Sequence, residues 1–215
     1  MTTEQLIDRI FDQLDDWRHL PAYQLERRAD IFFAIYLQVI IKKKFSEDID
    51  FIVPEFPVRI GNIYRTKHLT NPNLSFKIDY VAVSNKSKKV FLIELKTDDS
   101  SRRDKQDWYL DSVKKNNIKN LVDGVLEICK ATNSKKKYGN LLTLLSQIGW
   151  VDKSLTTNTS NDYLIEVVYI QPNSDDSDKT IITFREIVDY LSDNKDELSR
   201  RFSQSLIEWT TNPNN

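Results

Sequence analysis

An aspartate, a glutamate and a lysine between residues 76 and 97 are the side chains whose types and spacing could do chemistry. Asp79 is followed after fourteen residues by Glu94, and Lys96 comes two positions later. Carboxylate oxygens suit Mg²⁺ or Mn²⁺, and Mg²⁺ usually keeps several waters and binds substrate phosphate as well. Such an ion lowers the pKa of a bound water and offsets charge on a phosphoryl oxygen, while a neighbouring ammonium can hold or deprotonate the attacking water. These residue types therefore indicate metal-dependent phosphoryl chemistry.

The sequence around these residues predicts a β-hairpin that brings the two carboxylates together. Two runs rich in Val, Ile, Phe and Tyr flank a polar turn over residues 85–88, as expected of strand, turn and strand. A turn centred on this segment sets Asp79 opposite Glu94, with their Cβ atoms about 4.5–5.5 Å apart. Lys96 projects from the same strand face as Glu94, because side chains alternate along a strand. Both faces are apolar, which predicts a central, doubly covered hairpin; the residues are Ile78, Tyr80, Phe91 and Ile93 on one face and Val81, Val83, Val90 and Leu92 on the other.

A salt-bridge ladder on a solvent-facing strip is the structural alternative. Lys77 would lie opposite Lys96 in the same register, so two lysines and two acids could form the strip without catalysis. Like charges opposite each other destabilise a sheet, and buried carboxylates are costly unless they are paired or bound to metal. The apolar strand faces therefore argue against the strip and for a cation between Asp79 and Glu94.

Two helices are predicted ahead of the hairpin, over residues 3–17 and 22–44. Apolar residues recur at helical spacing in the first, and acids occupy its other face. Pro21 suits the first turn of the second helix. The apolar stripes consist of Leu6, Ile7, Ile10, Phe11 and Leu14 in the first helix and Ala22, Ala29, Phe33, Tyr36 and Ile40 in the second.

Glu26 lies on the apolar stripe of the second helix, where a carboxylate is unexpected. Taken alone, it fits a glutamate at the edge of the core that pairs with Arg9 or Arg27. A carboxylate directed toward the core could instead serve a site.

A strand is predicted over residues 51–60, where Pro54 and Pro57 mark a sheet edge or a strand end. Residues 61–74 read as a polar loop. Ser101 can cap the helix that follows the hairpin. The remaining predicted elements are helices over 101–114, 118–131 and 140–148, strands over 163–171 and 180–184, and helices over 185–192 and 195–209. With no repeat or low-complexity linker, one domain over residues 1–215 is the simplest division.

Composition excludes several other classes of protein. The net charge of −1 gives no global attraction to nucleic acid or membrane, and a lone cysteine, Cys129, fits a reducing compartment. The longest apolar run, residues 29–41, is too short to span a bilayer, and residues 1–20 lack the pattern of a signal peptide. Four glycines form no phosphate-binding loop, and His19 and His68 lack ligands at zinc spacing. We therefore expect a soluble cytoplasmic protein that does not bind membranes.

Asp79 on one strand, followed by Glu94, Leu95 and Lys96 at the end of the next, resembles the motif of the PD-(D/E)XK nuclease superfamily. The resemblance implies the restriction-endonuclease-like α/β fold, an αβββαβ core with a central mixed sheet flanked by helices. That order of elements matches residues 22–171, leaving an extra N-terminal helix and a C-terminal strand and helices over residues 178–209. Isoleucine stands where the family's name has proline, at a position that often varies.

The same resemblance implies the roles of individual residues. Asp79 and Glu94 would ligate Mg²⁺ or Mn²⁺, helped by the backbone carbonyl of Leu95, and Lys96 would position the water. Many members carry a glutamate on the first core helix that completes the site, which corresponds to Glu26.

Residues on the helix after the hairpin are the predicted substrate contacts. Some exonuclease-like members carry a glutamine and a tyrosine there, similar to Gln106 and Tyr109. Arg102 and Arg103 begin this helix and could contact phosphates. Residues 101–140 contain ten lysines and arginines against five acids, although an ordinary solvated helix face could account for any single lysine.

The sequence therefore predicts a metal-dependent nuclease that hydrolyses phosphodiester bonds, with DNA as the expected nucleic acid. The alternative is an inactive member of the fold that binds nucleic acid or another protein, and an unrelated structural protein ranks last. Endonuclease or exonuclease action, and homodimer formation, stay open.

Overall fold

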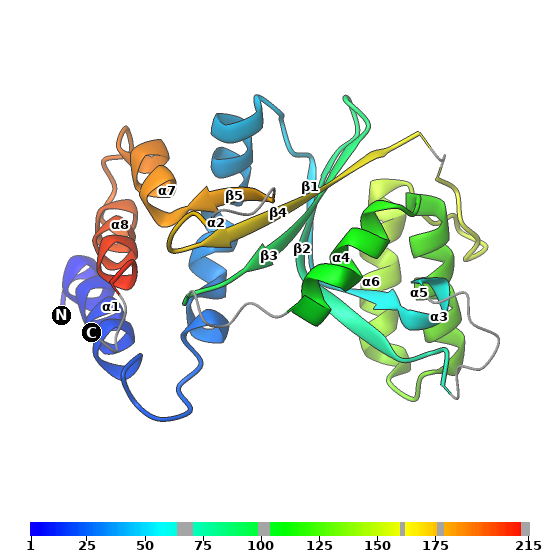
Figure 1. Ribbon diagram of the computed structural model, residues 1–215, viewed down its shortest axis with the longest axis horizontal. Helices are drawn as coiled ribbons and strands as arrows, with labels where there is room; N and C mark the ends of the chain where they lie inside the picture. Colours follow the sequence, from blue (N-terminus) through cyan, green and yellow to red (C-terminus); the bar gives the residue numbers. More distant parts are fainter. Residues whose placement is uncertain (64–70, 99–103, 160–161, 176–178, 212–215) are drawn as a thin grey trace. The chain divides into compact units, whose positions relative to one another are not determined.

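The computed structural model describes residues 1–63, 71–98, 104–159, 162–175 and 179–211. Contacts divide the chain into two compact units: unit 1 is 1–48, 95–102 and 168–215, and unit 2 is 49–94 and 103–167. The elements are α1 (Thr3–Trp17), α2 (Leu25–Phe45), β1 (Phe51–Arg59), α3 (Ile60–Ile63), β2 (Ser75–Ser84), β3 (Lys89–Leu95), α4 (Asp104–Lys114), α5 (Ile118–Ala131), α6 (Lys135–Ile148), β4 (Leu164–Gln171), β5 (Thr180–Thr183), α7 (Phe184–Leu191) and α8 (Glu197–Trp209) (Figure 1).

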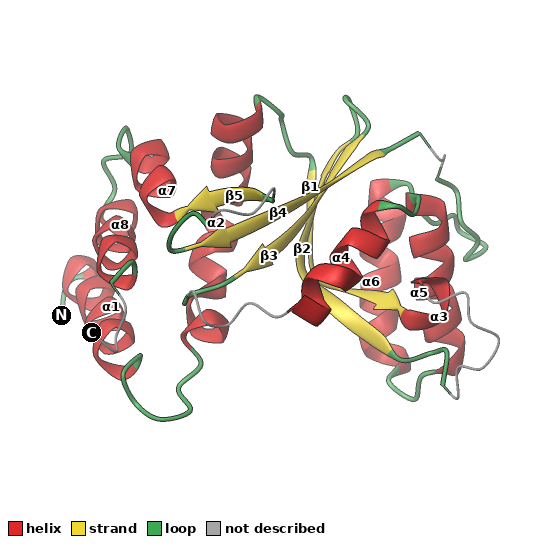
Figure 2. Ribbon diagram, viewed as in Figure 1, coloured by secondary structure: helices red, strands yellow, loops and turns green. Residues whose placement is uncertain are grey.

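The strands form one sheet in the order β1-β2-β3-β4-β5 (Figure 2). β1, β2 and β3 are antiparallel neighbours, whereas β4 and β5 are parallel. The Leu164 amide donates to the Lys88 carbonyl, and the Lys96 amide donates to the Ile170 carbonyl, each at 2.8 Å. Residue numbers rise together along β3 and β4, as in a parallel pair. The predicted α/β class with a mixed sheet flanked by helices is confirmed.

The hairpin of β2 and β3 has the predicted register. Tyr80 pairs with Ile93, and Val83 pairs with Val90, as a turn centred on residues 85–88 requires. The apolar residues predicted for its two faces are all buried. β2 and β3 also have neighbours on either side in the sheet, so the hairpin is central.

β1 is an edge strand, as its two prolines predict. Pro54 and Pro57 pair with Tyr80 and Lys77 of β2. Between the prolines, Glu55 has a positive φ of 52°, an unusual backbone conformation for a residue with a side chain. The edge therefore carries a local distortion beside the hairpin.

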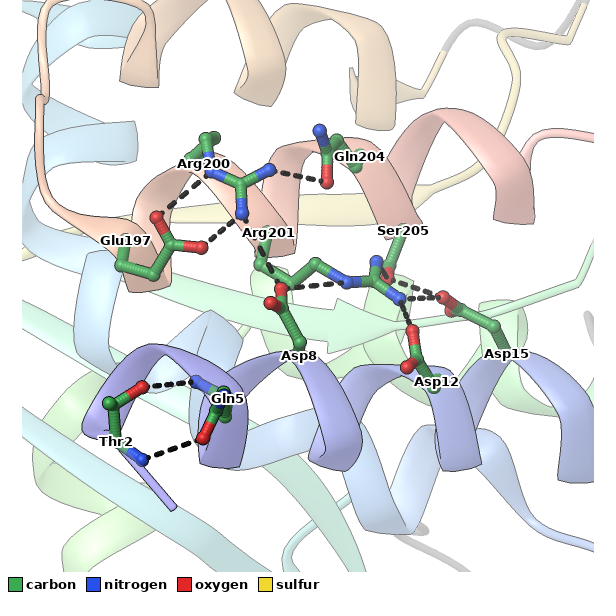
Figure 3. A network of polar contacts seen from close by, with 10 residues as sticks. All are labelled: Thr2, Gln5, Asp8, Asp12, Asp15, Glu197, Arg200, Arg201, Gln204 and Ser205. Atoms are coloured by element: carbon green, nitrogen blue, oxygen red, sulfur yellow. Dashed lines mark hydrogen bonds and ion pairs between the residues drawn. The ribbon is translucent and has the colours of Figure 1, made fainter.

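An aromatic cluster joins the helices of unit 1. The Phe11 ring of α1 lies 4.6 Å from Phe32 of α2 and 6.1 Å from Phe202 of α8. Phe202 also stacks on Tyr36, with their ring centroids 5.7 Å apart. The N-terminal and C-terminal helices thus share one core although they are far apart in sequence. Figure 3 shows polar contacts between α1 and α8 beside this core.

The bounds of α1 match the prediction, but two of the five residues predicted for its buried apolar face are exposed. Phe11 and Leu14 are buried, whereas Leu6 and Ile10 are exposed. The second helix begins at Leu25, three residues later than predicted. Ala22 has a φ of 61°, in the left-handed region, so the chain turns there before the helix starts.

Two further helices, α6 and α3, differ from the prediction. α6 begins at Lys135 rather than at residue 140, because Gly139 is accommodated inside the helix. The short helix α3 lies in the segment read as a loop, and its Asn62 donates to the Asn120 carbonyl at 2.6 Å. Among the helices in the described part of the chain, none is long and apolar enough to cross a membrane.

Candidate active site

Unit 2 contains two carboxylates on neighbouring strands. The paired register of β2 and β3 ends at Tyr80 and Ile93, and Asp79 and Glu94 are the next residues on the two strands. Glu94 is 2% exposed, and Asp79 is half-buried. A carboxylate as buried as that of Glu94 needs a cation or a hydrogen-bond donor near it.

Unit 1 contains a buried lysine, Lys96, that contacts a glutamate and a backbone carbonyl of the same unit. The Lys96 Nζ atom donates a hydrogen bond to the Leu95 carbonyl at 2.9 Å and lies 3.5 Å from Glu26 Oε2. Lys96 is 5% exposed. Glu26, in the first turn of α2, therefore faces the lysine two residues after Glu94, rather than only bordering the core.

The backbone around Lys96 is fixed by the parallel strand that follows. Its amide donates to the Ile170 carbonyl of β4 at 2.8 Å, immediately after β3 ends at Leu95. Thr97 is also buried. The sheet therefore fixes the backbone of Lys96, whereas its ammonium is held by the Leu95 carbonyl and Glu26.

The alternative interpretation, a solvent-facing strip of salt bridges, is contradicted for two of its four residues. Glu94 and Lys96 are buried. Only Lys77 has the character the strip requires, because it is exposed and its Nζ atom pairs with Glu55 Oε2 at 3.0 Å. The buried charges need a different explanation.

Glu55 is a carboxylate near the site that the sequence reasoning did not single out. The pairs Pro54 with Tyr80 and Phe56 with Ile78 flank it, so it lies beside Asp79 across the strands. The sequence feature that could have pointed to Glu55 is the pair of prolines around it, which mark β1 as the edge strand beside β2. Its salt bridge to Lys77 explains its presence without a catalytic role.

The donor set fits a hard divalent ion. Among the described residues, no group of three or more His, Cys, Asp and Glu side chains is arranged to hold a metal. Mg²⁺ needs fewer protein ligands, because it is usually bound through one or two carboxylates together with waters and substrate phosphates. Within unit 2, Asp79 and Glu94 are carboxylates of the type that such an ion accepts.

The predicted substrate contacts are only partly covered by the structure. Arg102 and Arg103 lie outside the described residues, and the side chain of Gln106 does too. Tyr109 is half-buried and stacks on Phe76 of β2, with ring centroids 4.8 Å apart. This stacking gives Tyr109 a packing role within unit 2.

Several lysines of the predicted basic segment have structural partners. Lys119 pairs with Asp123 and Lys130 with Glu127, at 3.1 and 2.7 Å. Lys135 donates to two carbonyls at the end of α5. These contacts favour the interpretation as a solvated helix surface for these three residues.

Cys129 is half-buried on α5, and burial raises the pKa of its thiol. A raised pKa lowers the thiolate fraction, so this residue is poorly suited to nucleophilic chemistry.

No family model, curated protein or solved structure matches the chain.

Proposed function

We propose that this protein is a metal-dependent nuclease that hydrolyses phosphodiester bonds in DNA. The observation that supports the proposal is the register of the hairpin, in which Asp79 and Glu94 directly follow the last paired residues, Tyr80 and Ile93. Lys96 follows two residues later and faces Glu26. The element order α2, β1, β2, β3, helices and β4 also agrees with the core of the PD-(D/E)XK fold.

The proposed roles follow from the chemistry of each group. Asp79, Glu94 and the Leu95 carbonyl would hold Mg²⁺ or Mn²⁺, which when bound supplies a Lewis acid for the phosphoryl oxygen and an acidified water. Lys96 carries three N–H donors, so its ammonium can orient a water for attack on phosphorus. Glu26 holds this ammonium through its carboxylate.

Plasmid nicking with Mg²⁺ or Mn²⁺ tests the proposal. We expect wild type to convert supercoiled plasmid to open circles, and we expect Asp79→Asn and Glu94→Gln to lose at least about a hundredfold in rate. Glu166→Gln is the matched control, because Glu166 is a part-buried glutamate of unit 2 that pairs with Lys89. Its rate should equal that of wild type.

A second measurement separates the enzyme from a binding module. DNA binding is followed by fluorescence anisotropy without metal, over a series of salt concentrations. Retained binding with no nicking under any divalent ion would reject the nuclease and favour the inactive member of the fold. Equal nicking by wild type and Glu94→Gln would instead assign the activity to a contaminant.

A further inference from the structure

The ammonium of Lys96 contacts an atom that the proposed metal site needs. Its Nζ atom donates to the Leu95 carbonyl oxygen at 2.9 Å, and the same nitrogen lies 3.5 Å from Glu26 Oε2. Both Leu95 and Lys96 are buried. The carbonyl expected to ligate a divalent ion is thus already engaged by a monovalent cation.

We propose that Lys96 is a built-in counter-cation, and that a divalent ion binds at the Leu95 carbonyl only as the ammonium leaves it. The inference rests on the proposed function for the identity of the metal ligands. It adds a form of regulation, because the lysine that serves the chemistry also sets how tightly the metal is held.

Electrostatics explain why the two cations exclude each other. A carbonyl oxygen has two lone pairs, so geometry alone would permit two partners. An ammonium and a divalent ion on one oxygen would nevertheless lie only a few ångströms apart, where repulsion is strong and water screens it poorly. The buried position of Lys96 keeps that repulsion large.

The movement that admits the ion would also prepare Lys96 for chemistry. In the observed conformation the side chain folds back to the carbonyl of the preceding residue. On release, the flexible four-carbon stem lets the ammonium turn while the backbone stays fixed by its bond to Ile170. Glu26 can keep its charge interaction with the ammonium during this movement, because its side chain is 33% exposed and less confined than Lys96.

Lys96→Met separates this proposal from a purely catalytic role for the lysine. Methionine keeps an unbranched side chain of similar length but removes the charge. Without metal, the variant should melt below wild type, because the buried Leu95 carbonyl loses its hydrogen-bond donor. With Mn²⁺, it should gain more in melting temperature than wild type and bind Mn²⁺ at least about tenfold more tightly.

Calorimetric Mn²⁺ titrations and thermal melts of wild type, Lys96→Met and Lys89→Met give the decision. Lys89 is the matched control, since it is a part-buried lysine on β3 that pairs with a glutamate, Glu166, at 4.0 Å. Lys89→Met should leave Mn²⁺ affinity unchanged. Repeating the titrations at high salt should preserve the effect of Lys96→Met, because buried charges are screened little.

The outcomes separate this inference from the proposed function. Equal or weaker Mn²⁺ binding by Lys96→Met, in a protein whose binding is lost in Glu94→Gln, overturns the inference and leaves the nuclease proposal standing. Mn²⁺ binding that Glu94→Gln does not alter removes the metal site itself, and the proposed function with it. Tighter binding by Lys96→Met alone supports the inference even if cleavage is lost.

Discussion

Glu26 is the residue at which a structural and a functional interpretation diverge most. Its carboxylate faces Lys96, and its side chain is about one third exposed. A partly exposed ion pair contributes little to stability, so Glu26→Gln should fold normally. If Glu26 holds the ammonium that orients water, Mg²⁺-dependent cleavage should fall at least about tenfold while the melting temperature changes little.

Nicking assays and thermal melts of Glu26→Gln, with Glu166→Gln as the control, check this prediction. A purely structural glutamate would give the reverse pattern, with a clearly lower melting temperature and unchanged cleavage.

Asp152 shows how a surface carboxylate can be held ionised by its own loop. Its side chain accepts hydrogen bonds from the hydroxyl and amide of Thr156 and from Ser154, which lowers the pKa of Asp152 to about 2. Because the folded-state pKa lies below the unfolded value, the loop is stabilised above about pH 4. That contribution disappears as the pH falls through about 2.

An NMR titration of the Asp152 carboxyl carbon measures this directly. The midpoint should lie near 2 in wild type and should rise toward its ordinary value in Thr156→Val, which removes the hydroxyl donor. A wild-type midpoint near 3.8, the ordinary pKa of an aspartate, would contradict the observed hydrogen bonds.

At the scale of elements, α1 and α8 are joined by a buried carboxylate. Asp15 accepts hydrogen bonds from Trp209 Nε1 at 2.8 Å, Arg201 Nη2 at 2.8 Å and Ser205 Oγ at 3.0 Å (Figure 3 shows the last two partners). Arg201 also pairs with Asp12 at 2.6 Å. One arginine of α8 thus neutralises two carboxylates that lie about one turn apart on α1.

Removing this arginine should destabilise the protein strongly. Arg201 is 11% exposed, and Arg201→Met would leave the buried Asp15 carboxylate without its cation. Breaking such a pair typically costs about 3–5 kcal/mol, which corresponds to a fall in melting temperature of roughly 6–20 °C in a protein of this size. Thermal unfolding measures the effect.

The neighbouring Arg200 supplies the control, because its salt bridges to Glu197 and Asp8 are exposed. Arg200→Met should change the melting temperature little. Adding Asp15→Asn to Arg201→Met should recover part of the loss, since the uncompensated charge is then gone. No recovery would mean that lost packing, rather than charge, explains the effect.

These elements also show which features the sequence could predict. The hairpin register followed from local information, because the polar turn between two apolar runs fixes which residues pair. The burial of Asp15 could not be predicted from local information. Its partner Trp209 is 194 positions away, and Asp15 belongs by its spacing to the polar face of α1. The start of α2 was missed for a local reason, the left-handed turn at Ala22.

The same distinction applies to the candidate site. Asp79, Glu94 and Lys96 could be identified because they share one hairpin segment. The contact of Glu26 with Lys96 joins residues 70 positions apart, so spacing alone left its partner open. The family resemblance implied that Glu26 completes the metal site, which stays a prediction, and the contact with Lys96 at 3.5 Å is what the structure adds.

At the scale of the whole molecule, the chain passes between the two units after residues 48, 94, 102 and 167. One passage falls between Glu94 and Leu95, and another falls within β4. Unit 1 therefore needs both ends of the chain, whereas unit 2 is built from its middle.

This division predicts how the molecule opens. Arg201 and Asp15 belong to unit 1, so Arg201→Met should accelerate amide hydrogen exchange in α1, α2, α7 and α8. Unit 2 has buried residues of its own on β2 and α5, including Val81, Leu121 and Val125, so amides there should keep their protection. Hydrogen exchange measured by mass spectrometry, with Arg200→Met as the reference, distinguishes the amides of the unit 1 helices from those of β2 and α5. Equal acceleration in β2 and α5 would show that both units open together, because disruption of the α1–α8 contact would then be transmitted through the sheet.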